Sequence, residues 1–304
     1  MPPTIAHIIN PVRVKPTSDL YHAQPVTFAT MLAAKEYAQG KATVTLYSAQ
    51  YEEDAGFVPH FFTQTPHLTQ AAPQFGKFTH YRKLPLIREI LQRLYDASTA
   101  DFLIYTNVDI AVTPNFYEAV AYYIEQGYDA FMINRRRIAA TYRHVHQIPA
   151  MVAEVGLPHP GFDCFVFHRD LFPLFKLENI CIGVPFIEIS LSHNLYCYAS
   201  NFVLLADKHL TFHIGREVFK DWADKEYVAH NRREFAKIKT NLMPYLDIRR
   251  FPYANLPFFR RYLSWIFNPA MQIGICLPLE WRAFKKKCRY RFNEFFLRFI
   301  SGWH

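Results

Sequence analysis

The residues of this chain best suited to chemistry are Asn107 and Asp109, two oxygen-bearing side chains one residue apart, directly after the apolar run at residues 102–105. Side chains two positions apart on an extended chain point the same way, so both can face one ion or ligand. Hard divalent cations take oxygen ligands and keep waters and substrate phosphates in their shell. Such residues also shape turns after strands, and this second interpretation stays open.

Two basic clusters flank this motif. Arg82 and Lys83 are expected to begin the helix before it, and Arg135 leads a run of three arginines at residues 135–137 after the next strand. Cations near a diphosphate stabilise the charge of a leaving group, and arginine suits that geometry. A solvated basic edge is the more ordinary account, so we expect a phosphate-binding role for at most one of the two clusters.

An alternating order of strands and helices must position these residues. Apolar or β-branched runs predict strands at residues 5–9, 42–48, 102–105, 130–134, 163–167 and 202–206. Helical spacing, caps and a closing glycine predict helices at residues 26–39, 84–94, 114–127 and 185–198. Residues 50–80, rich in Pro, His, Gln and Thr, predict a long loop.

This rhythm implies right-handed crossovers and a mostly parallel sheet flanked by helices. In such sheets, polar residues at the carboxyl ends of strands line the ligand crevice. Asn10, which follows the first strand, is therefore a candidate for cofactor binding together with Asn107 and Asp109.

The stretch from Arg82 to Asp109 resembles the GT-A type of nucleotide-sugar glycosyltransferase. In that family an amphipathic helix precedes an apolar strand, which ends in a DxD-like motif that binds Mn²⁺ or Mg²⁺ with the diphosphate of the sugar-nucleotide. Residues 103–109 match the motif, and the order of elements matches over roughly residues 5–216. The resemblance implies a GT-A-like fold, a nucleotide-sugar donor and a metal held by Asp109 and Asn107. Asn107 departs from the pattern because it stands where the first Asp would be and brings no charge.

The resemblance also implies roles for three residues further along the chain. His213 lies where many members supply a late histidine ligand, and imidazole suits Mn²⁺, although a hydrogen-bonded core histidine is the alternative. Asp163, at a glycine-containing turn, is the first candidate for the base that deprotonates the acceptor hydroxyl, and Glu188 is the second. Asp163 can instead simply hold the turn.

The charge divides the chain in two. The net charge is +8, and residues 249–304 carry eleven Lys/Arg against two acids, which leaves about −1 for residues 1–248. We expect a nucleotide-sugar-binding α/β domain at residues 1–248 and a helical, aromatic and basic appendage at residues 249–304. Residues 262–279 are 18 residues without charge, which is the lower limit for a membrane span, but their two prolines argue against a simple span. The preferred interpretation is a tail lying on an anionic membrane surface, with a packing appendage or a true membrane span as alternatives.

Other features narrow the class of protein. Five cysteines without a CxxC pair favour neither a disulfide framework nor a zinc cage, and the N-terminus lacks the pattern of a signal peptide, so we expect a cytoplasmic enzyme, peripheral on the inner membrane face.

The expected activity is transfer of a sugar from a nucleotide-sugar to a glycan or lipid-linked acceptor. An inactive nucleotide-sugar-binding relative and a nucleotidyltransferase are the alternatives; no glycine-rich phosphate loop supports the latter. Nucleic acid is not an expected partner, because no known binding motif accompanies the basic tail.

Overall fold

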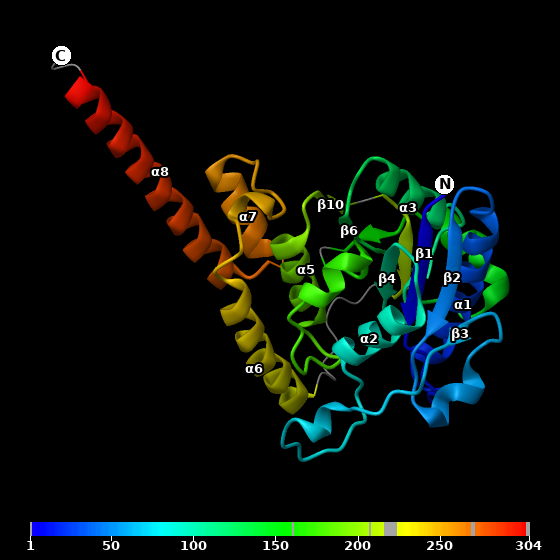
Figure 1. Cartoon of the computed structure of the whole chain (residues 1–304). Helices are drawn as coiled ribbons and strands as arrows, with labels where there is room; N and C mark the ends of the chain where they lie inside the picture. The colour runs from blue at the N-terminus through cyan, green and yellow to red at the C-terminus, as the bar shows by residue number, and fades with distance from the viewer. Residues whose placement is uncertain (1, 160, 207, 216–223, 269–270, 302–304) are drawn as a thin grey trace.

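The computed structural model describes residues 2–159, 161–206, 208–215, 224–268 and 271–301 (Figure 1). Its centre is a seven-stranded sheet. In spatial order the strands are β10 (Phe202–Leu205), β6 (Ala130–Ile133), β9 (Cys164–His168), β4 (Phe102–Thr106), β1 (Thr4–Ile9), β2 (Thr43–Ser48) and β3 (Thr63–Gln64). All neighbouring strands run parallel except β9, which is antiparallel to both β4 and β6.

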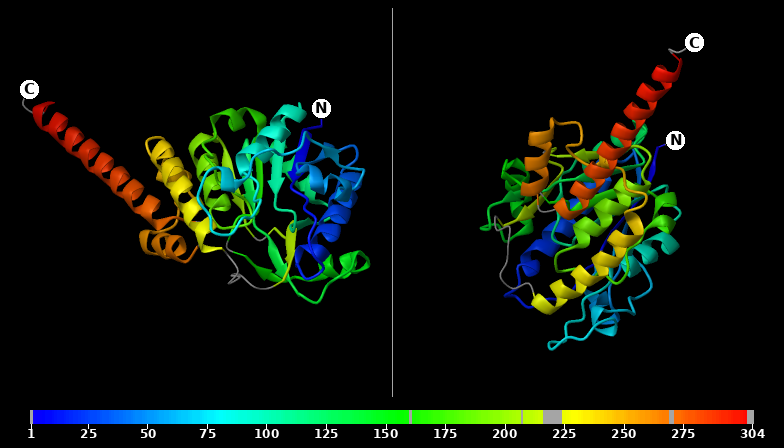
Figure 2. Two further views of the ribbon diagram at one scale, coloured as in Figure 1. Left: turned by 90° about the horizontal axis from the view of Figure 1, so that it is seen from below. Right: turned by 90° about the vertical axis from the view of Figure 1, so that its left-hand side faces the viewer.

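Helices cover both faces of this sheet, so the strands are buried on both sides (Figures 1 and 2). One face packs on α1 (Leu20–Tyr37) and α3 (Phe116–Glu125), and the other on α2 (Ile87–Ala97), α5 (Ile187–Tyr198) and α6 (Lys225–Leu242). All five residues of β4 are buried, as in a strand enclosed between two layers. The predicted α/β architecture, a mostly parallel sheet flanked by helices, is confirmed.

The reversed direction of β9 was not predicted. A parallel strand requires a crossover that returns the chain to the starting edge of the sheet, usually through a helix. Between β6 and β9 the chain instead stays at the carboxyl edge, where it forms β7 (Arg136–Ile138), α4 (Ile148–Ala153) and β8 (Leu157–Pro158). The chain therefore re-enters the sheet from that edge, and β9 runs the opposite way.

A second, four-stranded sheet lies beyond the carboxyl edge. Its order is β5 (Ala111–Val112), β11 (Thr211–Ile214), β7 and β8. β11 pairs antiparallel with β5, in the register Phe212 to Ala111, and parallel with β7, in the register His213 to Arg137. This pairing places β11 next to the residues that follow β4, about a hundred residues earlier in the chain.

Two helix boundaries differ from the prediction because of prolines. The first helix was predicted to begin at Val26, but α1 begins at Leu20 and contains Pro25, a residue that usually breaks helices. Arg82 and Lys83 were expected to begin the next helix, and this is wrong: α2 begins at Ile87. A residue before proline is disfavoured in helical conformation, so Pro85 keeps the preceding residues in an extended loop.

The C-terminal helices are α6, α7 (Phe258–Phe267) and α8 (Ile273–Ser301). Trp265 of α7 and Ile275, Cys276 and Leu279 of α8 are buried in the same core cluster as residues of the central sheet. Beyond that point α8 projects away from the body (Figures 1 and 2). No helix in the described part of the chain is both long enough and apolar enough to cross a bilayer. The domain boundary at residue 248 stays a prediction.

Two tryptophans test how the C-terminal helices are attached. Trp265 is 1% exposed and its Nε1 donates to the Pro252 carbonyl at 2.9 Å, whereas Trp281 of α8 is 58% exposed. We expect Trp265→Ala to lower the free energy of unfolding by about 3–5 kcal/mol, because it opens a cavity in the core. The control Trp281→Ala should change it by less than about 0.5 kcal/mol. Urea unfolding followed by far-UV circular dichroism measures both, and equal effects would contradict this packing.

Candidate active site

The candidate site begins where β4 ends. Asn107 and Asp109 are partly exposed while Val108 between them is buried, so the two polar side chains leave the core on the same side. The Ile110 N–H donates to the Asn107 carbonyl at 3.1 Å, which closes a turn. The turn interpretation and the ligand-binding interpretation are therefore compatible, because the turn aims both side chains out of the carboxyl edge.

His213 lies against Asp109 although the two are 104 residues apart. The His213 Nε2 is 3.2 Å from the Asp109 Oδ2. The pairing of β11 with β5 places them together, because Phe212 opposes Ala111 two positions beyond the acid. Both side chains are mostly buried, with 11% and 26% of their area exposed.

Electrostatics keep Asp109 ionised. Burial works against the charged form, but the hydrogen bond and charge of His213, with a contribution from Arg135, outweigh it and lower the pKa of Asp109 to about 2. At neutral pH Asp109 is therefore a carboxylate, and the His213 Nε2 lies beside its Oδ2.

A second ion pair stands next to the first. The Arg135 Nη1 donates to the Asp163 Oδ1 at 2.5 Å, and Asp163 is 1% exposed. The register of β6 and β9, with Ile133 opposite Cys164, places these residues beside each other at the strand ends. Burial raises the pKa of Asp163 despite the opposing charge of Arg135. Asp163 is thus fixed in place by an ion pair rather than open to solvent.

Glu188 lies in the first turn of α5 and is partly exposed. Burial, and then the neighbouring charge of Asp163, raise the pKa of Glu188 to about 7. The residue before the helix, Phe186, has φ 93°, a left-handed conformation that is rare for a residue with a large side chain. The start of α5 therefore combines backbone strain with a carboxyl group that titrates near neutral pH.

Tyr105 joins these groups into one site. Burial raises the pKa of Tyr105, and the charges of Asp109, Glu188 and Asp163 raise it further. Its hydroxyl donates to the Asn107 Oδ1 at 2.8 Å. The amide oxygen predicted to bind a metal is therefore already engaged by one hydrogen bond.

The other predicted ligand-binding residues occupy different positions. Asn10 is buried and donates from its Nδ2 to the Ala49 carbonyl at 2.5 Å, so it ties together the ends of β1 and β2. The Lys83 Nζ pairs with the Glu53 Oε1 at 2.5 Å and lies 4.0 Å from the centre of the Tyr51 ring. Both residues are therefore engaged with partners other than the Asp109–His213 pair.

Arg82 and the arginine run also separate into different roles. The Arg82 N–H donates to the Tyr227 hydroxyl at 2.8 Å, which holds its loop on α6. Arg136 donates to the carbonyls of Val155 and Gly156 and so supports the loop before β8. Arg135, the first of the three consecutive arginines, pairs with Asp163 of the site.

Sequence reasoning missed two buried polar residues beside Asp163. The Asn134 Nδ2 donates to the His159 carbonyl at 3.1 Å, and burial, with the charges of Arg135 and Arg137, lowers the pKa of His159 to about 3. Among the described residues, the Asn134 Oδ1, the His159 Nδ1 and the Asp163 Oδ2 have no hydrogen-bond partner. Buried polar atoms are normally paired, so three of them together mark a place for water or ligand hydroxyls. The position of Asn134 at a strand end was the signal that could have identified it.

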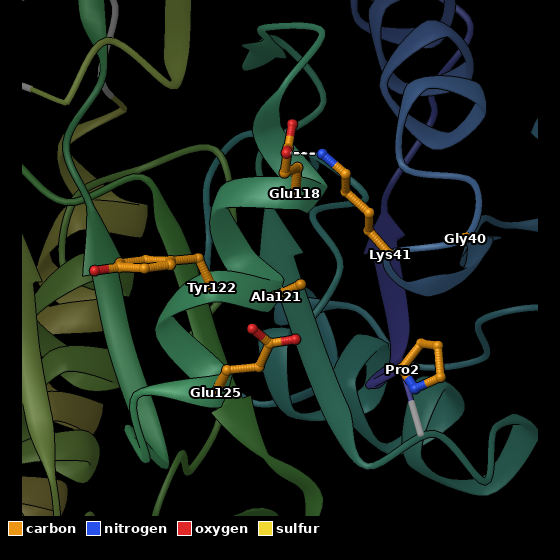
Figure 3. A pocket seen from close by; sticks show the side chains of 7 residues that line it. All are labelled: Pro2, Gly40, Lys41, Glu118, Ala121, Tyr122 and Glu125. Atoms are coloured by element: carbon orange, nitrogen blue, oxygen red, sulfur yellow. Dashed lines mark hydrogen bonds and ion pairs between the residues drawn. The ribbon is translucent and has the colours of Figure 1, made fainter.

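A separate cavity of about 510 Å³ lies at the opposite edge of the sheet (Figure 3). Its lining residues are Pro2, Gly40, Lys41, Glu118, Ala121, Tyr122 and Glu125. Pro2 comes just before β1, so this hollow opens at the amino ends of the strands. Ligands of open α/β sheets bind at the carboxyl ends, and the titratable groups described above lie there.

Glu188 provides a test of the site's electrostatics in the free protein. Because the folded state raises its pKa, Glu188 costs stability as pH rises from its ordinary value through about 7. We expect Glu188→Gln to be about 2 kcal/mol more stable than the parent chain at pH 8 and nearly equal at pH 4.5. Urea unfolding at both pH values measures this. Glu125→Gln, an exposed site on α3, is the control, and a pH-independent difference for Glu188→Gln would contradict the raised pKa.

No protein-family model and no curated protein sequence matches this chain. Among solved structures, S. aureus TarS 1–349 in complex with UDP-GlcNAc is 9% identical with a TM-score of 0.40, covering 90% of this chain and 82% of that one. M. tuberculosis glucosyl-3-phosphoglycerate synthase is 15% identical with a TM-score of 0.46, covering 79% and 81%. The same synthase with Mn²⁺ and UDP-glucose is 15% identical with a TM-score of 0.44, covering 79% of each chain. At these identities and TM-scores, the chemistry of this chain has to be inferred from its own residues.

Proposed function

We propose that this chain is a metal-dependent glycosyltransferase that moves a sugar from a nucleotide-sugar to an acceptor hydroxyl. The observation that carries the proposal is the Asp109–His213 pair, an ionised carboxylate and an imidazole 3.2 Å apart at the carboxyl edge of a mostly parallel sheet. Nearby carboxyl groups with raised pKa values supply a candidate base.

The pair fits one divalent cation. Two ligands about 2.1 Å from an octahedral ion lie about 3 Å apart, close to the observed separation of the Asp109 oxygen and the His213 nitrogen. No group of three His, Cys, Asp or Glu side chains in the described part of the chain can hold a metal. In the proposal, water and diphosphate oxygens complete the shell, as is usual for Mg²⁺ and Mn²⁺ at nucleotide sites. When bound, the ion neutralises charge on the departing diphosphate.

Glu188, rather than Asp163, is the proposed general base. A base works best with a pKa near the operating pH and with access to the substrate, and Glu188 has both a pKa of about 7 and partial exposure. Asp163 is 1% exposed and paired with Arg135, so its proposed role is to hold Arg135 and to keep the pKa of Glu188 high. This reverses the order expected from the sequence.

The proposed reaction inverts the configuration of the sugar. The Glu188 carboxylate takes the proton of the acceptor hydroxyl while the oxygen of that hydroxyl bonds to the anomeric carbon. The bond from that carbon to the diphosphate oxygen breaks, and the electron pair leaves with the nucleoside diphosphate. In this proposal the unpartnered Asn134 Oδ1 and Asp163 Oδ2 accept hydrogen bonds from the sugar's hydroxyls, and the unpartnered His159 Nδ1 donates or accepts according to its tautomer.

The substrates follow from these roles. The donor is a nucleotide-sugar, with Asn107, Asn10 and Arg135 as the proposed contacts for its nucleotide and phosphates. Of the two basic clusters, the proposal uses Arg135 and leaves out Arg82 and Lys83, which contact Tyr227 and Glu53. The proposed acceptor is a hydroxyl of a glycan or of a lipid-linked carrier, a choice supported by the aromatic and basic character of the C-terminal helices.

One observation favours a second candidate, an inactive nucleotide-sugar-binding relative. Asn107 brings no charge, and its Oδ1 already accepts a hydrogen bond from Tyr105. A carboxylate at this position would add both charge and a further metal ligand. The two candidates differ in turnover but share donor binding, so binding and catalysis need separate tests.

Donor binding is tested first. Titration calorimetry with UDP, in the presence and absence of Mn²⁺, should show tighter binding with the metal. We expect Asp109→Ala to abolish that increment and His213→Ala to reduce it by about tenfold or more, because each removes one of two protein ligands. The control Asp96→Ala removes an exposed acid at the end of α2. An unchanged metal increment in Asp109→Ala would rule out the proposed metal site.

Turnover is tested with water as the acceptor, by following release of UDP from a panel of UDP-sugars. We expect the rate to rise with pH through about 7, and Glu188→Gln to lower it by about 10²–10⁴-fold with donor affinity unchanged. Asp163→Asn should keep the pH profile but shift its midpoint downward, because a neighbouring charge is lost. Full activity in Glu188→Gln would exclude this base, and donor binding without turnover in the parent chain would favour the inactive relative.

A further inference from the structure

Helix α7 presents an apolar face to solvent. Phe259 and Phe267 are 79% and 78% exposed, and Leu263 between them is 52% exposed. These residues are four apart, so they form one stripe along the helix. On the opposite side Trp265 is buried, and Arg261 forms an ion pair with Glu280 of α8. The outward stripe is therefore not the side with which α7 packs on the body.

Helix α8 repeats this arrangement. Leu277, Trp281, Phe284 and Cys288 are all exposed, and their spacing of four, three and four residues keeps them on one face. The Trp281 and Phe284 rings stack, with centroids 5.7 Å apart. Ile275, Cys276 and Leu279 lie on the other face, in the core, so the helix carries apolar residues both toward the body and away from it.

The body holds α8 at its inward side. The Arg282 guanidinium donates to the carbonyls of Met243 and Leu246, which anchors this face of the helix just after α6. Every residue from Trp281 to Arg289 is exposed, and the helix projects from the body over this stretch (Figure 1). Exposed apolar stripes on two consecutive helices are larger than scattered surface residues and mark an interaction surface.

Basic side chains border the α8 stripe. Lys285, Lys286, Lys287 and Arg289 are exposed, and the Lys285 Nζ lies 5.2 Å from the centre of the Trp281 ring. Glu280, the single acid between residues 258 and 289, is already paired with Arg261. The uncompensated charge around the stripe is therefore positive.

We propose that the outward faces of α7 and α8 form a docking surface for an anionic lipid bilayer, with the aromatic stripe in the headgroup region and the lysines against lipid phosphates. Aromatic rings and long basic side chains are the residues that suit this interface. A second copy of the chain would bring the same positive charge to the contact, so charge complementarity favours lipid over self-association. The proposal does not depend on transferase activity.

Cosedimentation with vesicles tests the surface, using the full chain at low salt. We expect binding to vesicles of phosphatidylcholine with phosphatidylglycerol and little binding to phosphatidylcholine alone. Replacing Lys285, Lys286 and Lys287 by Ala should lower the partition coefficient by roughly a hundredfold, since each basic residue near such a surface contributes about fivefold. The double variant Trp281→Glu, Phe284→Glu should lower it by about tenfold or more.

The control is Tyr37→Glu with Tyr122→Glu, two exposed aromatics of similar accessibility on α1 and α3. Circular dichroism checks that every variant is folded, and analytical ultracentrifugation without lipid reports the association state. Lipid binding that survives the α8 variants, or falls equally in the control, would overturn the proposal. A dimer that the Trp281 and Phe284 changes dissociate, in a chain that ignores anionic vesicles, would overturn it in favour of self-association.

Discussion

The arrangement of the site depends on the pairing of β11 with β5 and β7. His213 of this short strand comes 104 residues after Asp109, yet two backbone ladders fix the strand beside the turn that follows β4. Without this pairing, the turn would hold a single carboxylate at the edge of the sheet. With it, an imidazole nitrogen and a carboxylate oxygen are held in one orientation by backbone hydrogen bonds, which is more precise than holding them by flexible loops.

The second constraint is the number of acids in a small volume. The charges of Asp109, Asp163 and Glu188 all raise the pKa of Tyr105, and these three charges are not stabilised equally. His213 stabilises the charge of the first and Arg135 that of the second. Glu188 forms no ion pair within the described part of the chain, and its pKa rises to about 7. Neighbouring carboxyl groups with different pKa values can serve different chemical roles in one site.

Much of the fold was predictable because burial leaves a clear pattern. β4 is a continuous apolar run, and polar residues follow directly at its carboxyl end, which was enough to place Asn107 and Asp109. The direction of β9 was not predictable, because strand composition does not depend on direction. The order of Asp163 and Glu188 as candidate bases also required coordinates, since burial and ion pairing, rather than residue type, distinguish them. The start of α2 after Lys83 could also not be predicted with certainty, because helical spacing begins at Leu84 while Pro85 opposes a helix before it.

The left-handed backbone of Phe186 has a consequence for how this protein can vary. A conformation that costs on the order of 1–3 kcal/mol persists only if its surroundings compensate, and here the Phe186 ring packs on Phe235 of α6, 5.7 Å between centroids. Glycine would adopt the backbone without strain but would lose that ring contact. The position of Glu188 in the first turn of α5 therefore depends on the contact between Phe186 and Phe235 of α6. Changes in the α5–α6 interface are a route by which evolution can alter the pKa and position of Glu188.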